Sequence, residues 1–161
     1  MTKRFQTAIK NIYKRVKYMN SDTARLLKSC NLGCKYASSG MEHVLPFVKN
    51  VALKSYIEDI NSKHICVGET CKELLHENGK TTSEPAALNM FASRIKRDFK
   101  LSFSPTAKTV ASIMVDSCEM GIKDMCKALK NCPAADKESV DLVKTIIKTE
   151  QCFLEEMIEY Y

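Results

Sequence analysis

Two polar residues interrupt apolar stripes in this sequence and mark where chemistry could take place. His64 and Glu150 each occupy a position at which the 4-3 spacing of the surrounding apolar residues predicts Leu or Ile on the buried face of a helix. Burial of an imidazole or a carboxylate is costly unless the group is paired or coordinated. Cys34 and Cys118 occupy stripe positions on two further predicted helices. We therefore take these four residues as the candidate site.

The spacing of these residues from the predicted turns places them at a similar depth. Cys34 lies about 15 residues before the first hairpin turn, and His64 lies about 15 residues after it. Cys118 lies about 15 residues before the second hairpin turn, and Glu150 lies about 16 residues after it. At about 1.5 Å per residue, each residue is then ~22–25 Å from its turn. The sequence therefore predicts one layer with one ligand-type side chain from each helix.

Such a layer is a coherent set of metal ligands. Two thiolates, an imidazole and a carboxylate suit tetrahedral Zn(II), whereas two thiolates and an imidazole suit Cu(I). Cys30 and Cys71 lie about one turn beyond Cys34 and His64 on the facing stripes and are secondary ligands in this interpretation.

A metal-free interpretation stays open beside it. Cysteine on a helix stripe commonly serves as a small buried apolar residue. His64 can also simply hydrogen-bond Glu150 in an otherwise dry core. In this interpretation the layer is structural and the protein has no cofactor.

Long helices must position these side chains. The chain has 161 residues but only 5 Gly and 4 Pro, fewer turn residues than an all-β domain needs. No apolar run approaches the ~18 residues of a membrane span.

Asp22, Asn50 and Asp136 are predicted N-caps of three long helices. Apolar periodicity and turn signals predict an all-α chain with helices over about 3–19, 22–48, 50–78, 83–101, 105–131 and 136–161.

The connections predict the topology. Short turns join the two long helices of each pair, which makes them antiparallel neighbours, and residues 79–104 are long enough to traverse the bundle. We expect residues 21–161 to form a four-helix bundle of two antiparallel hairpins joined by one long helical crossover. Residues 1–20 form an added basic amphipathic helix. A simple up-down bundle with an inserted short helix is the alternative.

With this topology the chain resembles the ferritin-like superfamily over about residues 22–161. That family places one Glu on each of two helices and a Glu-x-x-His on each of the other two, around two metal ions. The corresponding positions here carry Asn61-x-x-His64, Glu150-x-x-Phe153, Cys34 and Cys118. The resemblance therefore implies a degenerate two-metal motif. Iron is less suitable than Zn or Cu, because oxidised iron prefers hard oxygen ligands.

Two further resemblances concern the plan of the bundle. Ferritin-like bundle proteins of gut or spore-associated bacteria are similar in plan. The inward thiols also resemble those of the cysteine-lined copper-storage proteins, although these carry a denser cysteine lining than this chain. That resemblance implies Cu(I) as the ion.

The net charge of +6 comes entirely from the first 20 residues, which carry six cations and no acid. The rest of the chain is neutral, so no specific nucleic-acid partner is expected. We expect residues 3–19 to pack their apolar face on the bundle. Self-association into a homo-oligomer and contact with an anionic membrane are open alternatives, and membrane contact is not favoured.

Cysteine usage predicts a reducing, cytoplasmic setting with free thiols. The 8 Cys have irregular spacings with no CxxC pair, and no secretory signal precedes them. The chain has no glycine-rich phosphate loop, no GxSxG and no HExxH. These absences favour a protein that is not an enzyme.

The sequence therefore predicts a non-catalytic, ferritin-like bundle whose Cys/His/Glu layer binds one transition metal, Zn or Cu. The alternative is a metal-free interaction or structural module that acts through its surface and its basic N-terminal helix.

Deletion of residues 1–19 tests the division of the chain. Because the four long stripes begin at Thr23 and the rest of the chain is charge-neutral, the truncated protein is expected to keep its helicity and a cooperative thermal transition. Circular dichroism during heating measures both. A broad transition or a collapse of helicity would show that residues 1–19 belong to the core.

Overall fold

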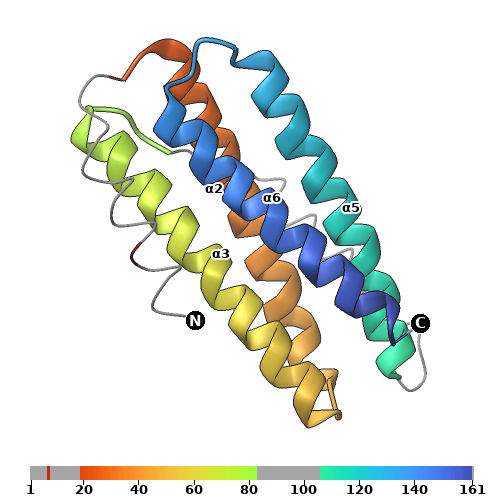
Figure 1. The fold of residues 1–161 in the computed structure, drawn as a ribbon. Helices are drawn as coiled ribbons and strands as arrows, with labels where there is room; N and C mark the ends of the chain where they lie inside the picture. Colours follow the sequence, from red (N-terminus) through yellow and green to blue (C-terminus); the bar gives the residue numbers. More distant parts are fainter. Residues whose placement is uncertain (1–6, 8–18, 83–105, 161) are drawn as a thin grey trace.

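The computed structural model describes Thr7, residues 19–82 and residues 106–160 (Figure 1). Within these residues the chain is helical and contains no strand, which confirms the predicted all-α class. The predicted helix over 3–19, apart from Thr7 and Met19, and residues 83–104 of the predicted crossover lie outside the described residues. The helices are α2 (Ser21–Val44), the short 3-10 helix η1 (Leu45–Phe47), α3 (Val51–Glu77), α5 (Ala107–Asn131) and α6 (Lys137–Ile158).

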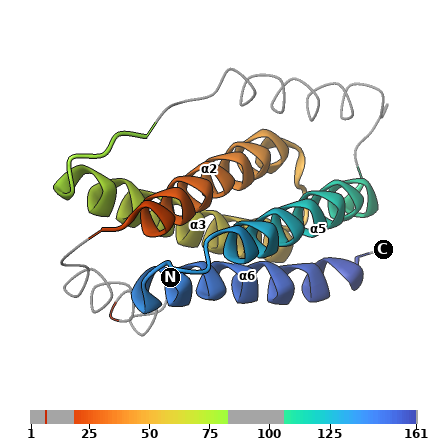
Figure 2. The same cartoon turned by 90° about the horizontal axis from the view of Figure 1, so that it is seen from above.

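The four long helices form two antiparallel hairpins that lie side by side (Figures 1 and 2). Helix α2 packs against α3 and α5, and α6 packs against α5 and, less extensively, against α2 and α3. The α2–α3 turn and the α5–α6 turn lie at opposite ends of the bundle (Figure 1). The end of α3 and the start of α5 also lie at opposite ends, so the connection between them must span the length of the bundle.

Hydrogen bonds tie the start of α2 to the α5–α6 turn. The side-chain amide of Asn20 donates to the Ala134 carbonyl at 2.7 Å, and the backbone N–H of Ala134 donates to the Asp22 carboxylate at 3.0 Å. The N–H of Asp136 donates to the Thr23 hydroxyl at 2.9 Å. These bonds fix how one hairpin stands against the other.

Side-chain caps begin the helices. Asn50 and Asp136 cap α3 and α6, as predicted, by accepting from the N–H groups of Leu53 and Ser139. The predicted cap Asp22 is wrong, because Asn20 caps α2 and Asp22 lies in the first turn. The Asp22 carboxylate is occupied instead by the α5–α6 turn and by Arg25.

The helix ends follow from Gly and Pro. Helix α3 ends at Glu77 and is followed by Gly79 with φ of +64°, a backbone conformation that favours glycine. The N–H of Lys80 returns to the Leu75 carbonyl at 2.9 Å and closes this end. Helix α2 ends at Val44, before the predicted end at Val48, because Pro46 converts the last turn into η1.

The apolar core is divided into two clusters along the bundle. One surrounds the end at which α2 begins and includes Leu27, Leu74 and Leu142. The other surrounds the end at which α3 begins and includes Leu53, Met114 and Phe153. The buried His64 and Glu150 belong to neither cluster.

Helices α2 and α3 approach each other closely at Gly68. A Cβ atom at Gly68 would lie 3.3 Å from the Cβ of Cys34. The buried Asn31 amide of α2 donates to the Gly68 carbonyl at 2.8 Å, so the two backbones are held at this separation.

We expect Gly68→Val to destabilise the protein by about 1–3 kcal/mol, because the added methyl groups force the two helices apart. Gly121→Ala is the matched control, since a Cβ there meets no described atom within 4 Å. Removing a helical glycine should leave this control unchanged or stabilise it by up to ~1 kcal/mol. Urea denaturation gives both free energies of unfolding. Equal midpoints for the two variants would contradict close packing at Gly68.

Candidate functional site

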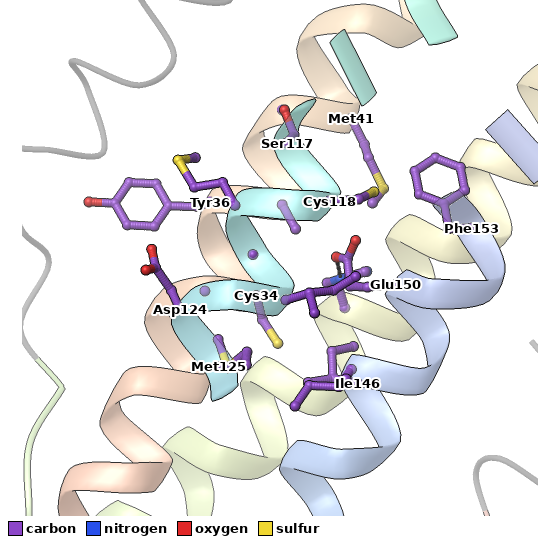
Figure 3. Close-up of a pocket in the computed structure, with 18 of the residues that line it drawn as sticks. Cys34, Tyr36, Met41, Ser117, Cys118, Asp124, Met125, Ile146, Glu150 and Phe153 are labelled. Atoms are coloured by element: carbon purple, nitrogen blue, oxygen red, sulfur yellow. Dashed lines mark hydrogen bonds and ion pairs between the residues drawn. The ribbon is translucent and has the colours of Figure 1, made fainter. Parts of the chain in front are cut away.

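A pocket opens among the helices at the middle of the bundle, and all four helices line it (Figure 3). Its cavity volume is about 80 Å³. The four residues predicted from the sequence all line this pocket: Cys34 from α2, His64 from α3, Cys118 from α5 and Glu150 from α6. All four are buried, as the stripe positions predict.

His64 and Glu150 form a buried pair that joins α3 to α6. The Nε2 atom of His64 lies against Oε1 of Glu150, and the side chains are 2% and 8% exposed. The other ring nitrogen, Nδ1, lies 3.0 Å from the Ile60 carbonyl. Since a carbonyl only accepts, Nδ1 must carry a proton and donate it, which fixes the orientation of the ring. The pair therefore meets the requirement that buried polar groups be hydrogen-bonded.

The protonation of His64 depends on Glu150. Burial alone lowers the pKa of His64, but the hydrogen bond to Glu150 and its negative charge outweigh burial, so the pKa lies above its ordinary value. Glu150 is not fully satisfied, because its second oxygen, Oε2, is buried without a hydrogen-bond partner among the described residues. Oε2 thus has no N–H or O–H donor among the described residues, and the only donor group beside the carboxylate other than His64 is the weak S–H of Cys118.

The two predicted thiols lie on opposite sides of this pair (Figure 3). Cys118 lies within hydrogen-bond reach of Glu150, and burial, the charge of Glu150 and the hydrogen bond from the thiol to its carboxylate together raise the pKa of the Cys118 thiol. Cys34 turns the other way, toward the thiols of Cys30 and Cys71, and joins them in the apolar cluster near the start of α2. The four residues therefore line one pocket without forming a single ligand group.

Cys30, Cys34 and Cys71 form a buried cluster of three thiols, hereafter the thiol cluster. Cys30 lies within hydrogen-bond reach of both other thiols, which lower the pKa of Cys30 well below its ordinary value despite burial. The positive charge of His64 acts in the same direction. The pKa values of Cys34 and Cys71 are raised, first by donation to Cys30 and then by burial. Cys30 is thus the thiol of the cluster whose ionisation the surrounding groups favour most.

The donor set does not fit a two-metal centre. His64 and Glu150 bind each other, while Asn61 and Phe153 stand where the ferritin-like pattern has a second Glu and a second His. Within the described ranges, no group of three or more His, Cys, Asp or Glu side chains is already arranged to hold a metal ion. Ion binding by the thiol cluster therefore requires its thiols to rotate. All eight cysteines are free.

Sequence reasoning missed the pocket itself. Its wall includes Gly33, Gly40 and Gly121; the Met125 side chain fills the space at Gly33, whereas a Cβ at Gly121 would meet no described atom within 4 Å. Glycine inside a helical pattern was the available signal, since it is unfavourable there without a packing or functional reason. The methionines Met41, Met114 and Met125 are buried and line the pocket.

No protein-family model, no curated protein and no solved structure matches this chain. Among the helices that the structure describes, none is both long and apolar enough to cross a membrane.

A double-mutant cycle tests the buried pair in chelator-treated protein. His64→Leu or Glu150→Leu alone should destabilise the protein by about 3–5 kcal/mol, because each leaves a buried polar partner uncompensated. The double variant His64→Leu/Glu150→Leu should be much less destabilised than the sum, since two apolar residues then fill the layer. Chemical denaturation measures the three free energies. Additive effects would show that the two groups do not depend on each other.

Proposed function

We propose that this chain is a non-catalytic, ferritin-like helical bundle that binds one soft metal ion, Cu(I) in preference to Zn(II), through the thiols of Cys30, Cys34 and Cys71. One observation carries the proposal: three buried thiols from α2 and α3 meet at one place, with Cys30 within hydrogen-bond reach of the other two. Binding would replace the S–H···S bonds of the cluster by sulfur–metal bonds, and each thiol that binds the ion would release its proton to solvent.

The character of the cluster favours Cu(I). Soft thiolate ligands select Cu(I), which is satisfied by few donors, whereas structural Zn(II) takes four. The thiol cluster offers three, and the nearest imidazole, that of His64, is held by Glu150.

The remaining predicted ligands have other partners in this proposal. His64 and Glu150 stay paired, and Cys118 stays beside Glu150 on the pocket side. The positive charge of His64 then supports the metal site electrostatically, because it favours the thiolate form of Cys30. A Zn(II) site built from Cys34, His64, Cys118 and Glu150 would require the pair to separate.

Helix directions support the ferritin-like part of the proposal. Both hairpins are antiparallel, and α3 ends at the opposite end of the bundle from the start of α5 (Figure 1). Two hairpins joined by one long crossover are the arrangement of ferritin-like folds. The fold carries no reaction with it, because function depends on the site and not on the fold.

Thermal unfolding with and without Cu(I), under anaerobic conditions, tests the proposal. At 100 times the dissociation constant, a bound ion stabilises the native state by about 2.7 kcal/mol, which raises Tm by roughly 5–10 °C for a chain of this size. Single variants Cys30→Ala, Cys34→Ala and Cys71→Ala should each reduce the shift strongly. Metal analysis of protein purified without chelator gives the stoichiometry.

Two matched controls separate specific binding from thiol scavenging. Cys126→Ala and Cys152→Ala alter exposed thiols outside the cluster and should keep the full Cu(I)-dependent shift. If chelator-treated wild type melts no lower than the copper-loaded form, the proposal fails. The metal-free interaction module, acting through its surface and residues 3–19, would then be the better account.

A further inference from the structure

Cys34, one of the three proposed metal ligands, lines the pocket, but the space beside Cys118 and Glu150 has no role in the proposed metal site. Figure 3 shows Cys118 and Glu150 at the pocket, with Cys34 on the other side of Glu150 from Cys118. We propose that this pocket binds a small apolar molecule that carries one ammonium group, such as a short alkylamine, with the ammonium donating to Oε2 of Glu150.

The first argument is the unsatisfied oxygen. Glu150 is 6% exposed and lines the pocket, and its Oε2 is buried with no hydrogen-bond partner among the described residues. A buried acceptor without a donor is unfavourable, and a bond to a charged donor is among the stronger hydrogen bonds. A ligand that places an N–H at this oxygen would supply what the described part of the protein does not.

The second argument is the charge of the pocket lining. Its described residues include the carboxylates of Asp124 and Glu150 and no Lys or Arg. Asp124 lies at the exposed rim and is paired with Lys127 at 3.3 Å. His64 has both ring nitrogens engaged, and the Ser117 hydroxyl donates to the Ile113 carbonyl at 2.8 Å. The lining therefore offers acceptors to a cation and no free cationic donor to an anion.

The third argument is the size and surface of the space. A cavity of about 80 Å³ is roughly half of the ~150 Å³ that accommodates benzene in an engineered apolar cavity, so it suits a chain of about five heavy atoms. Met41, Met114 and Phe153 line it. Methionine side chains adapt to a guest because they are unbranched and polarisable. These residues fit the alkyl part of the ligand.

Methyl NMR of the full chain, labelled with ¹³C at the methionine methyls, tests the inference. Chelator is present, so the outcome does not depend on the metal proposal. Three probes with a four-carbon chain are titrated: n-butylammonium, butan-1-ol and butyrate. We expect n-butylammonium to shift the Met41, Met114 and Met125 methyls saturably, with a Kd about ten-fold or more below that of butan-1-ol, and butyrate to give no saturable shift.

Two variants locate the effect. Glu150→Gln keeps the shape and can still bond His64, but it should abolish the preference for n-butylammonium over butan-1-ol. Gly121→Leu adds a side chain where a Cβ meets no described atom within 4 Å, so it should fill the pocket and prevent binding of both.

The order of affinities of the three probes for the wild-type protein tests the inference even if a variant fails to fold. Equal binding of the amine and the alcohol, preferential binding of butyrate, or no saturable shift of these methyls would each overturn the inference. Retention of the amine preference in a folded Glu150→Gln variant would also overturn it.

Discussion

The structure depends on the burial of one imidazole and one carboxylate in the middle of a four-helix core. His64 and Glu150 are each too costly to bury alone, and each makes the other acceptable through a hydrogen bond that joins α3 to α6. This requirement fixes the level at which the two hairpins meet. It also fixes the imidazole ring, because Nδ1 is held by the Ile60 carbonyl.

Two regions of the interior beside this pair differ in chemistry. In the thiol cluster, Cys30 has the thiols of Cys34 and Cys71 within hydrogen-bond reach, which is a soft-metal environment. The pocket lies beside Cys118 and Oε2 of Glu150, and Cys34 is also part of its lining. The charge of His64 influences the thiols, while the incomplete hydrogen bonding of Glu150 is directed to the pocket. Two occupants of different chemistry can therefore be proposed for one core.

Much of this fold could be predicted because it depends on local signals. Asn50, Asp136 and Gly79 start or end helices by their own backbone and side-chain chemistry. The stripe positions of His64 and Glu150 predicted burial, and their distances from the predicted hairpin turns predicted a common level. Although the hairpin turns lie at opposite ends of the bundle, these residues lie near the middle of helices of 27 and 22 residues. Their levels therefore still coincide.

The remaining features depend on tertiary contacts that spacing does not contain. Spacing gives the depth of Cys34 and Cys118 but not the side of the pair to which each thiol turns. Asp22 has a cap-like sequence position, yet the α5–α6 turn takes its carboxylate and leaves capping to Asn20. The pocket is lined by Gly40 of α2 and Gly121 of α5, and a Cβ at Gly121 would meet no described atom within 4 Å. Such a combination is visible only once the helices are paired.

The central claim is that His64 and Glu150 stay hydrogen-bonded to each other, so that only the thiols bind the ion. Identifying the atoms bound to the ion tests this claim most directly. X-ray absorption spectroscopy of the copper-loaded protein reports these atoms. The account predicts a Cu(I) edge and a first coordination shell made of sulfur alone. Nitrogen or oxygen ligands in the first shell would contradict it, since they would show that the pair opens and that its imidazole or carboxylate binds the ion.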